Sequence, residues 1–153
     1  AQQRQIFYVS QGGYDFHDNL PADQSRLLKE LGDAMAAFYA ATTALGVADS
    51  VTTFTTSEFG RALQSNGRGS DHGWGSHHFI MGGAVLGNRV YGSFPTVAIG
   101  GAEDAGQGRL IPTTSVDEYA ATLARWFGVS DSHLPTVLPN IGRFARRNLG
   151  FLG

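Results

Sequence analysis

Side chains able to bind a metal ion gather in three polar segments of this sequence. Carboxylate and imidazole groups occur together in these segments, and the chain contains no cysteine. The candidate ligands, in chain order, are Asp15, His17, Glu58, Asp71, His72 and His77. Carboxylate and imidazole ligands without thiolate suit Zn²⁺ or Mn²⁺ more than a purely structural zinc site. The sequence therefore predicts a centre for one or two divalent ions.

The spacing of the candidate ligands indicates how they could act together. Asp15 and His17 are two residues apart, so both side chains point the same way if the backbone is extended. Asp71 and His72 are adjacent and would point apart. That arrangement suits either two bridged ions or one ligand beside one orienting group.

Each segment also has an interpretation that needs no metal. Asp15 could belong to an Asx-turn, and Glu58 could form a local ion pair with Arg61. His77 and His78 could be one buried and one exposed ring at the start of a strand. Because three separate segments carry ligand-type residues, a shared site is the favoured interpretation.

The catalytic candidate in the second segment is Arg61, whose guanidinium could stabilise an anionic transition state. Ser57 and Ser70 lie near the candidate ligands, but no nucleophile pattern such as G-x-S-x-G marks either of them. We therefore expect this segment to be inactive on its own.

Hydrophobic patterning predicts an α/β protein. Residues 6–10 and 51–56 form apolar, β-branched runs typical of strands, and residues 20–45 show helical periodicity that ends at Gly46. Strand, helix and strand in sequence predict a βαβ unit with two parallel, adjacent strands. The expected fold is a doubly wound, mostly parallel sheet, with ligands at the carboxyl ends of its strands.

Further short strands are expected at residues 78–81, 89–91 and 96–99. Ser115 and Glu118 have the spacing of a capping box, which predicts the start of a final helix that stops near Gly128. The remainder of the chain is expected to be irregular and packed on the body.

Composition narrows the class of protein. The chain has 153 residues and a formal net charge of −2, without the clustered Lys and Arg that a nucleic-acid partner requires. No apolar run approaches the roughly 18 residues of a membrane span. The absence of cysteine excludes disulfides and is compatible with a periplasmic or secreted protein.

Three motifs resemble a known family. GGYDFHDN, TTSEFGR and above all DHGWGSHHFIMGG are similar to the C-terminal part of the DUF1501 proteins of bacteria, over a stretch from Ile6 to about Phe144. That family is grouped with the alkaline phosphatase/sulfatase superfamily, and many of its members resemble twin-arginine-exported proteins. The resemblance implies a single domain over residues 1–153, forming the C-terminal half of an alkaline phosphatase-like fold. The implied partners are an N-terminal half absent from this chain, or another copy, and a small anionic ester.

The resemblance also implies roles for particular residues. Asp15 and His17 look like the pair that binds the first metal ion, with His72 or His77 as its third ligand. The Ser57-Glu58-Phe59-Gly60 stretch lies where superfamily enzymes usually carry Asp-His-Gly, so Glu replaces Asp and Phe replaces His at a second metal site.

Two functions remain open at this point. The first is metal-dependent hydrolysis of phosphate or sulfate esters, with the metal as Lewis acid. The second is a non-catalytic exported binding or assembly protein that kept the fold, which the Glu-Phe departure favours. The number of ions bound distinguishes them, since two ions favour the hydrolase.

Overall fold

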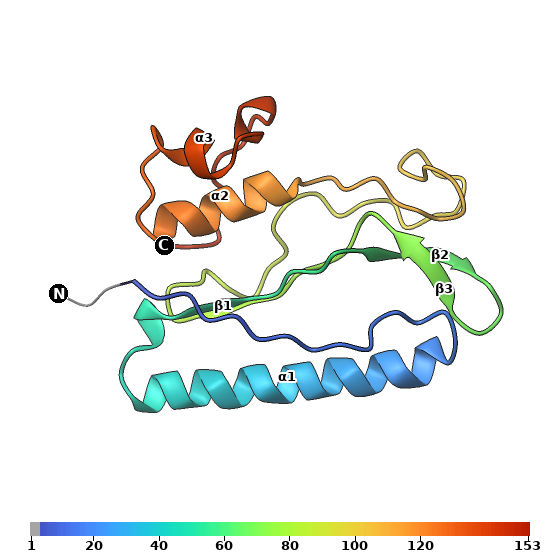
Figure 1. The fold of residues 1–153 in the computed structure, drawn as a ribbon, viewed down its shortest axis with the longest axis horizontal. Coiled ribbons are helices and arrows are strands. Elements are labelled where there is room, and N and C mark those ends of the chain that lie inside the picture. Colours follow the sequence, from blue (N-terminus) through green and yellow to red (C-terminus); the bar gives the residue numbers. More distant parts are fainter. Residues whose placement is uncertain (1–3) are drawn as a thin grey trace.

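The computed structural model describes residues 4–153 (Figure 1). Three α-helices, two 3₁₀ turns and four short strands are assigned in this part of the chain. In chain order they are α1 (Leu20–Ala44), η1 (Ala48–Ser50), β1 (Thr52–Phe54), β2 (Gly60–Ser65), β3 (Ser70–Gly73), β4 (Ile80–Gly82), α2 (Val116–Trp126), α3 (Leu134–Val137) and η2 (Ile141–Arg143).

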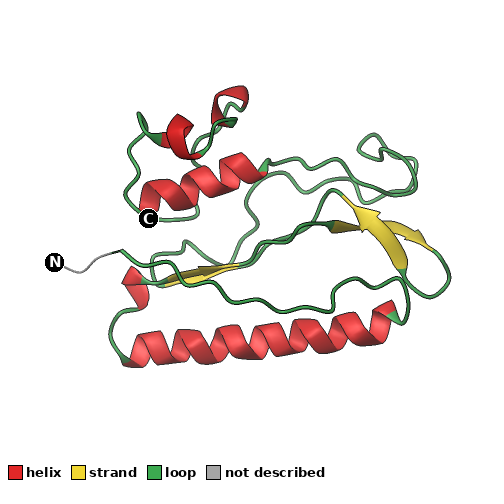
Figure 2. Ribbon diagram, viewed as in Figure 1, coloured by secondary structure: helices red, strands yellow, loops and turns green. Residues whose placement is uncertain are grey.

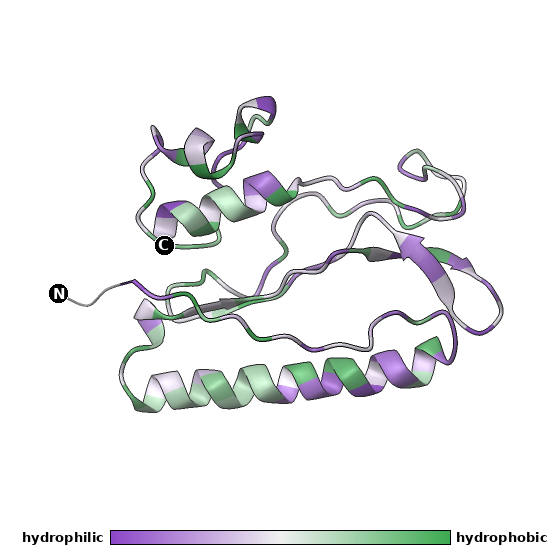
Figure 3. Ribbon diagram, in the orientation of Figure 1, coloured by the Kyte–Doolittle hydropathy of each residue, from purple (hydrophilic) through white to green (hydrophobic). Residues whose placement is uncertain are grey.

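The elements form a layered arrangement. In Figures 1 and 2 the small β1–β4 sheet lies between the long helix α1 and the C-terminal helix α2. The ring of Tyr119 on α2 packs edge-on against Phe54 of β1, with centroids 6.2 Å apart. The β2–β3 hairpin lies at the N-terminal end of α1, where the N–H of Leu20 donates to the carbonyl of Arg68 at 3.1 Å. This end of the molecule is predominantly hydrophilic (Figure 3).

Helix α1 confirms the helical pattern in the first third of the sequence. Pro21 occupies its first turn, where a missing N–H has no cost. Asn19 precedes the helix in a left-handed conformation, and its side chain makes no capping bond to the helix backbone. The helix ends before Gly46, whose φ of 70° is the left-handed conformation expected of a glycine after a helix.

Helix α2 begins at the predicted capping box. The Ser115 hydroxyl accepts from the Glu118 N–H at 3.0 Å, and the Glu118 carboxylate accepts from the Ser115 N–H at 3.0 Å. The adjoining core is small and consists of Ala121, Leu134 and Ile141, all fully buried. The segment after the helix is therefore packed on the body as expected, with α3 and η2 as short helical turns within it.

The predicted parallel pairing of residues 6–10 with residues 51–56 is wrong for the structure described. β1 pairs with β4 in antiparallel register, Phe54 opposite Ile80. Residues 6–10 form no assigned strand, and within residues 4–153 their backbone makes no hydrogen bond to another backbone group. Their apolar side chains are 78–90% exposed, so the segment has strand-type residues but no neighbouring strand.

The structure is a mixed α/β protein with two small antiparallel sheets, β1–β4 and β2–β3. The predicted strand at residues 78–81 corresponds to β4, one or two residues later. The runs at residues 89–91 and 96–99 are not strands but parts of a long irregular connection to α2. Among the helices of residues 4–153, none combines the length and apolar character needed to cross a membrane.

Candidate metal centre

The site is built where the β2–β3 hairpin packs against the segment before α1. The N–H of Ser70 donates to the carbonyl of Phe16 at 3.1 Å, and Asn66 Nδ2 donates to the carbonyl of His17 at 3.0 Å. Gly69 makes this approach possible, because a Cβ there would lie 2.1 Å from the Phe16 oxygen. Only glycine permits two backbones to come so close.

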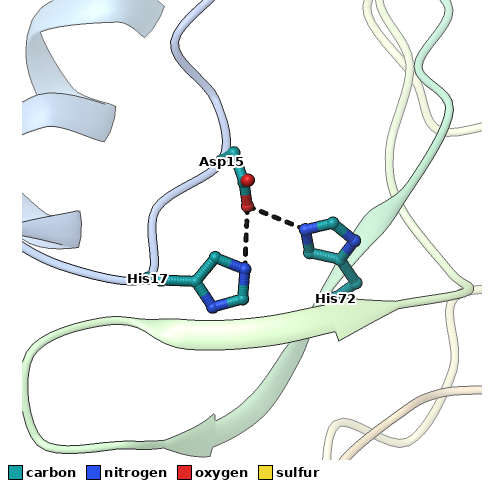
Figure 4. Close-up of side chains that lie close together, drawn as sticks. All are labelled: Asp15, His17 and His72. Atoms are coloured by element: carbon teal, nitrogen blue, oxygen red, sulfur yellow. Dashed lines mark hydrogen bonds and ion pairs between the residues drawn. The ribbon is translucent and has the colours of Figure 1, made fainter.

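Asp15, His17 and His72 meet at this junction (Figure 4). Asp15 Oδ1 lies 2.9 Å from His17 Nε2 and 2.7 Å from His72 Nε2. The three donor atoms all lie within 4.8 Å of one another, and all three residues are exposed to solvent. Asp15 and His17 come from the segment before α1 and His72 from β3, so two distant parts of the chain supply the set.

The three donor atoms fit a divalent ion. Zinc takes carboxylate oxygen and imidazole nitrogen at about 2.0–2.2 Å, which places tetrahedral ligand atoms roughly 3.3 Å apart. The two contacts of Asp15, at 2.7 and 2.9 Å, need to widen by only a few tenths of an ångström. Three protein ligands leave a fourth position open, as catalytic zinc sites do. Because the three side chains are exposed, an ion has direct access.

Phe59 fixes the ring of His72. The two rings are stacked face to face, 4.0 Å between centroids and 3° between planes. The Ser57 hydroxyl and the Phe59 backbone hydrogen-bond across the turn before β2, which holds Phe59 in place. The residue that replaces a superfamily histidine in the motif comparison therefore packs on a candidate ligand.

Arg61 is the most buried charged group next to the cluster, with 16% of its side chain exposed. Its Nε donates to the Ser70 hydroxyl at 3.2 Å, its Nη2 donates to the Ser70 carbonyl, and its Nη1 donates to Asp15 Oδ1 at 3.2 Å. The pKa of Asp15 lies below its usual value, first because of the hydrogen bond from His72 and then because of Arg61 and the nearby imidazoles. Asp15 is therefore held as a carboxylate, the form that binds metal.

Asp71 lies beside the three-residue cluster. Its Oδ1 is 3.6 Å from His17 Nδ1, and its Oδ2 is 3.5 Å from Nη2 of Arg109. Arg109 was not predicted from the sequence, because it lies in a glycine-rich loop 48 positions after Arg61 and no motif connects the two. Three of the four charged side chains nearest the imidazoles thus come from segments that were predicted, and one does not.

Glu58 and His77 lie outside the cluster that the structure brings together, so the expected convergence does not extend to them. Glu58 is exposed on the turn before β2. The ring of His77 packs against Phe94, 5.2 Å between centroids. His78 stacks on Tyr119 and has a lowered pKa, mainly because burial disfavours its charged form. Both rings are taken up by aromatic packing under the irregular connection and α2.

Neither serine near the cluster is free to act as a nucleophile. The Ser57 hydroxyl donates to the Phe59 carbonyl at 2.9 Å. Ser70 is 5% exposed and its hydroxyl accepts from Arg61. A cavity of about 650 Å³ beside the hairpin shares Arg61 and Ser70 with this region, but the three cluster residues do not line it.

Comparisons with known proteins point to one family. The model of a protein family described as "Protein of unknown function (DUF1501)" matches residues 1–138. No curated protein and no solved structure matches the chain. Since the family model covers nine-tenths of the sequence, this chain belongs to the DUF1501 family.

Proposed function

We propose that Asp15, His17 and His72 bind a divalent metal ion, Zn²⁺ or Mn²⁺, and that the protein hydrolyses phosphate or sulfate esters. The observation that carries the proposal is the convergence of one carboxylate oxygen and two imidazole nitrogens, from two distant segments, within 4.8 Å. Exposed acidic groups are common without an ion, but two imidazoles on one carboxylate are a far more selective set of ligands.

The residues around the ion would bind and orient an anionic ester. A divalent ion in this position acts as a Lewis acid on the ester oxygens. Arg61 holds Asp15 in place and brings a fixed positive charge to the cluster, with two of its three nitrogens bound to Ser70. Arg109, with 29% of its side chain exposed, adds a second positive charge on the Asp71 side. An ester anion that approaches the open ligand position therefore meets two guanidinium groups.

The nucleophile in this proposal is water or a residue outside residues 4–153, since Ser57 and Ser70 are both engaged. A larger, doubly wound sheet belongs to the same proposal. The exposed run at residues 6–10 would be one of its strands, paired by a missing N-terminal half of the same protein or by another copy. The 78–90% exposure of the apolar side chains at residues 6–9 supports this extension.

A non-catalytic binding or assembly role is the second candidate, and one observation favours it. The accessible surface of the chain is 10159 Å². A compact monomer of this mass exposes roughly 7,500 Å² by the usual scaling of surface with mass. So large an excess is typical of a chain that packs against something else. In either role the protein would work in the periplasm or outside the cell, which rests on the resemblance to exported proteins.

Metal binding and ester hydrolysis test the two candidates together. Metal content is measured on the purified chain, and hydrolysis of p-nitrophenyl phosphate and p-nitrophenyl sulfate is followed on the longest natural form of the protein. The proposal predicts bound metal, hydrolysis that requires it, and loss of both in His17→Ala. His133→Ala is the matched control, because His133 bonds to Ser130 and takes no part in the cluster. Metal binding without hydrolysis of either ester supports the non-catalytic role.

A further inference from the structure

Beside the candidate ligands lies an ion-pair chain that they do not need for charge balance alone. It runs from Arg109 to Asp71 and from Asp71 to His17. The two ring nitrogens of His17 face different carboxylates. Nε2 lies 2.9 Å from Asp15, whereas Nδ1 lies 3.6 Å from Asp71. The ring is thus placed between the metal cluster on one side and an acceptor on the other.

Arg109 is held in place by an ordered loop rather than left free on the surface. The carboxylate of Asp104 accepts three backbone N–H groups, from Gly100, Gly106 and Gly108, at 2.7 to 2.8 Å. Those bonds lower the pKa of Asp104, so the carboxylate stays charged and keeps the loop closed.

The same loop is attached to the hairpin that carries His72. The N–H of Leu63 on β2 donates to the carbonyl of Gly108 at 2.9 Å. A Cβ at Gly108 would lie 2.6 Å from Cβ of Leu63, so only glycine permits this contact. The next residue is Arg109, whose position relative to β2 is fixed by this attachment.

We infer that Asp71 and Arg109 position His17, and that Asp71 is an acceptor for its Nδ1 proton rather than a metal ligand. This inference rests on the proposed metal centre and adds the groups that orient one of its ligands. Histidine ligands commonly donate their second N–H to a carboxylate, which fixes the ring and strengthens the ligand nitrogen. A small rotation of the exposed Asp71 side chain closes the 3.6 Å contact to a hydrogen bond. Asp71 then holds Nδ1 protonated and leaves Nε2 free to bind the ion.

The chain offers a matched control for Asp71. Asp18 has the same exposed fraction of its side chain, 57%, and also pairs with an arginine, Arg68 at 2.8 Å. Asp18 does not contact the cluster. Asp71→Asn and Asp18→Asn therefore remove one exposed, arginine-paired charge each, but only the first removes the acceptor beside His17.

Two measurements on the full chain test the inference. In the first, Zn²⁺ affinity is measured by competition with a chromophoric chelator. Asp71→Asn is expected to weaken binding by about 10–100-fold, the usual effect of losing a partner of a ligand. Asp18→Asn is expected to leave it unchanged. Arg109→Gln should weaken binding less than Asp71→Asn, and Arg109→Lys should restore part of the loss.

The second measurement needs no metal. Long-range ¹H–¹⁵N correlation spectra report which nitrogen of each neutral histidine carries the proton. Asp71→Asn should raise the fraction of His17 protonated on Nε2 and leave His133 unchanged. If neither the affinity nor this fraction changes in Asp71→Asn, the inference is overturned while the metal centre stands. X-ray absorption that shows one ligand fewer in zinc-loaded Asp71→Asn also overturns it, because Asp71 would then be a direct ligand. If the wild-type chain binds no metal, the proposed function fails, and the proton position on His17 still decides the role of Asp71.

Discussion

The carboxylate of Asp15 and the imidazole of His72 lie 2.7 Å apart although 57 positions separate them in the chain. This contact joins the segment before α1 to strand β3. It depends on the close approach of the hairpin to residues 16–18, and it brings together the side chains that the proposed function requires.

The close approach at Gly69 predicts the effect of a single added methyl group. Gly69→Ala places a Cβ against the backbone of Phe16 and His17, which cannot move without displacing Asp15. We expect a destabilisation of about 1–3 kcal/mol, typical of overpacking, and a loss of metal affinity, since the two halves of the site separate. Thermal unfolding and metal titration measure these effects. Gly12→Ala is the control, because a Cβ at Gly12 meets nothing within 4 Å.

A second prediction concerns the stacked ring of Phe59. Phe59→Leu removes the aromatic face on which His72 lies and frees the imidazole to rotate. Stacked aromatic pairs contribute about 0.5–1.5 kcal/mol beyond the area they bury, so metal affinity should fall by several-fold to about tenfold. Phe94→Leu is the matched control, because its ring packs on His77 outside the cluster. Equal affinities in Phe59→Leu and wild type would show that the stack does not position His72.

The lowered pKa of Asp15 predicts how stability depends on pH in the metal-free protein. The unfolded carboxyl binds a proton at a higher pH than the folded one, because His72 and Arg61 favour the charged form in the folded state. The stabilisation is therefore complete above the ordinary pKa of an aspartate, near 4, and is lost as the pH falls through the lowered value. Melting temperatures between pH 2 and 6 (~4 units around that pKa) measure this. Asp15→Asn should flatten the acid side of the curve, and Asp33→Asn, on the exposed face of α1, should not.

The exposed apolar run at residues 6–9 predicts association of the isolated chain. Backbone groups without partners and four exposed apolar side chains are a template for pairing with another strand. Sedimentation velocity should detect species larger than a monomer. Substituting Phe7 and Val9 by Lys should reduce them, because charges oppose strand pairing at an exposed edge. A wild-type chain that sediments as a single monomer at high concentration would contradict this.

Local signals in the sequence predicted the two long helices, and the long-range arrangement was harder to predict. The periodicity of α1 and the Ser115–Glu118 capping box act within a few residues, so the sequence alone identifies them. The pairing partner of a strand is not a local property. Residues 6–10 carry strand-type side chains, but β1 pairs with β4 instead.

The candidate site shows the same division between local and long-range signals. Asp15, His17 and His72 were predicted because their residue types and segments are those of a metal site. His77 has the same chemistry, but its packing against Phe94 is a tertiary contact that no spacing predicts. Arg109 reaches the site through the loop closed by Asp104, and the glycines of that loop were its only signal.

The most direct test of the metal centre compares two histidines of one segment. Metal content is measured by mass spectrometry of the purified chain after loading with Zn²⁺ and removal of excess ion, for wild type, His72→Ala and His77→Ala. His72 belongs to the cluster and His77 packs on Phe94 instead. The account predicts bound zinc in wild type and His77→Ala and its loss in His72→Ala. Zinc retained in His72→Ala, or lost equally in both variants, would contradict it.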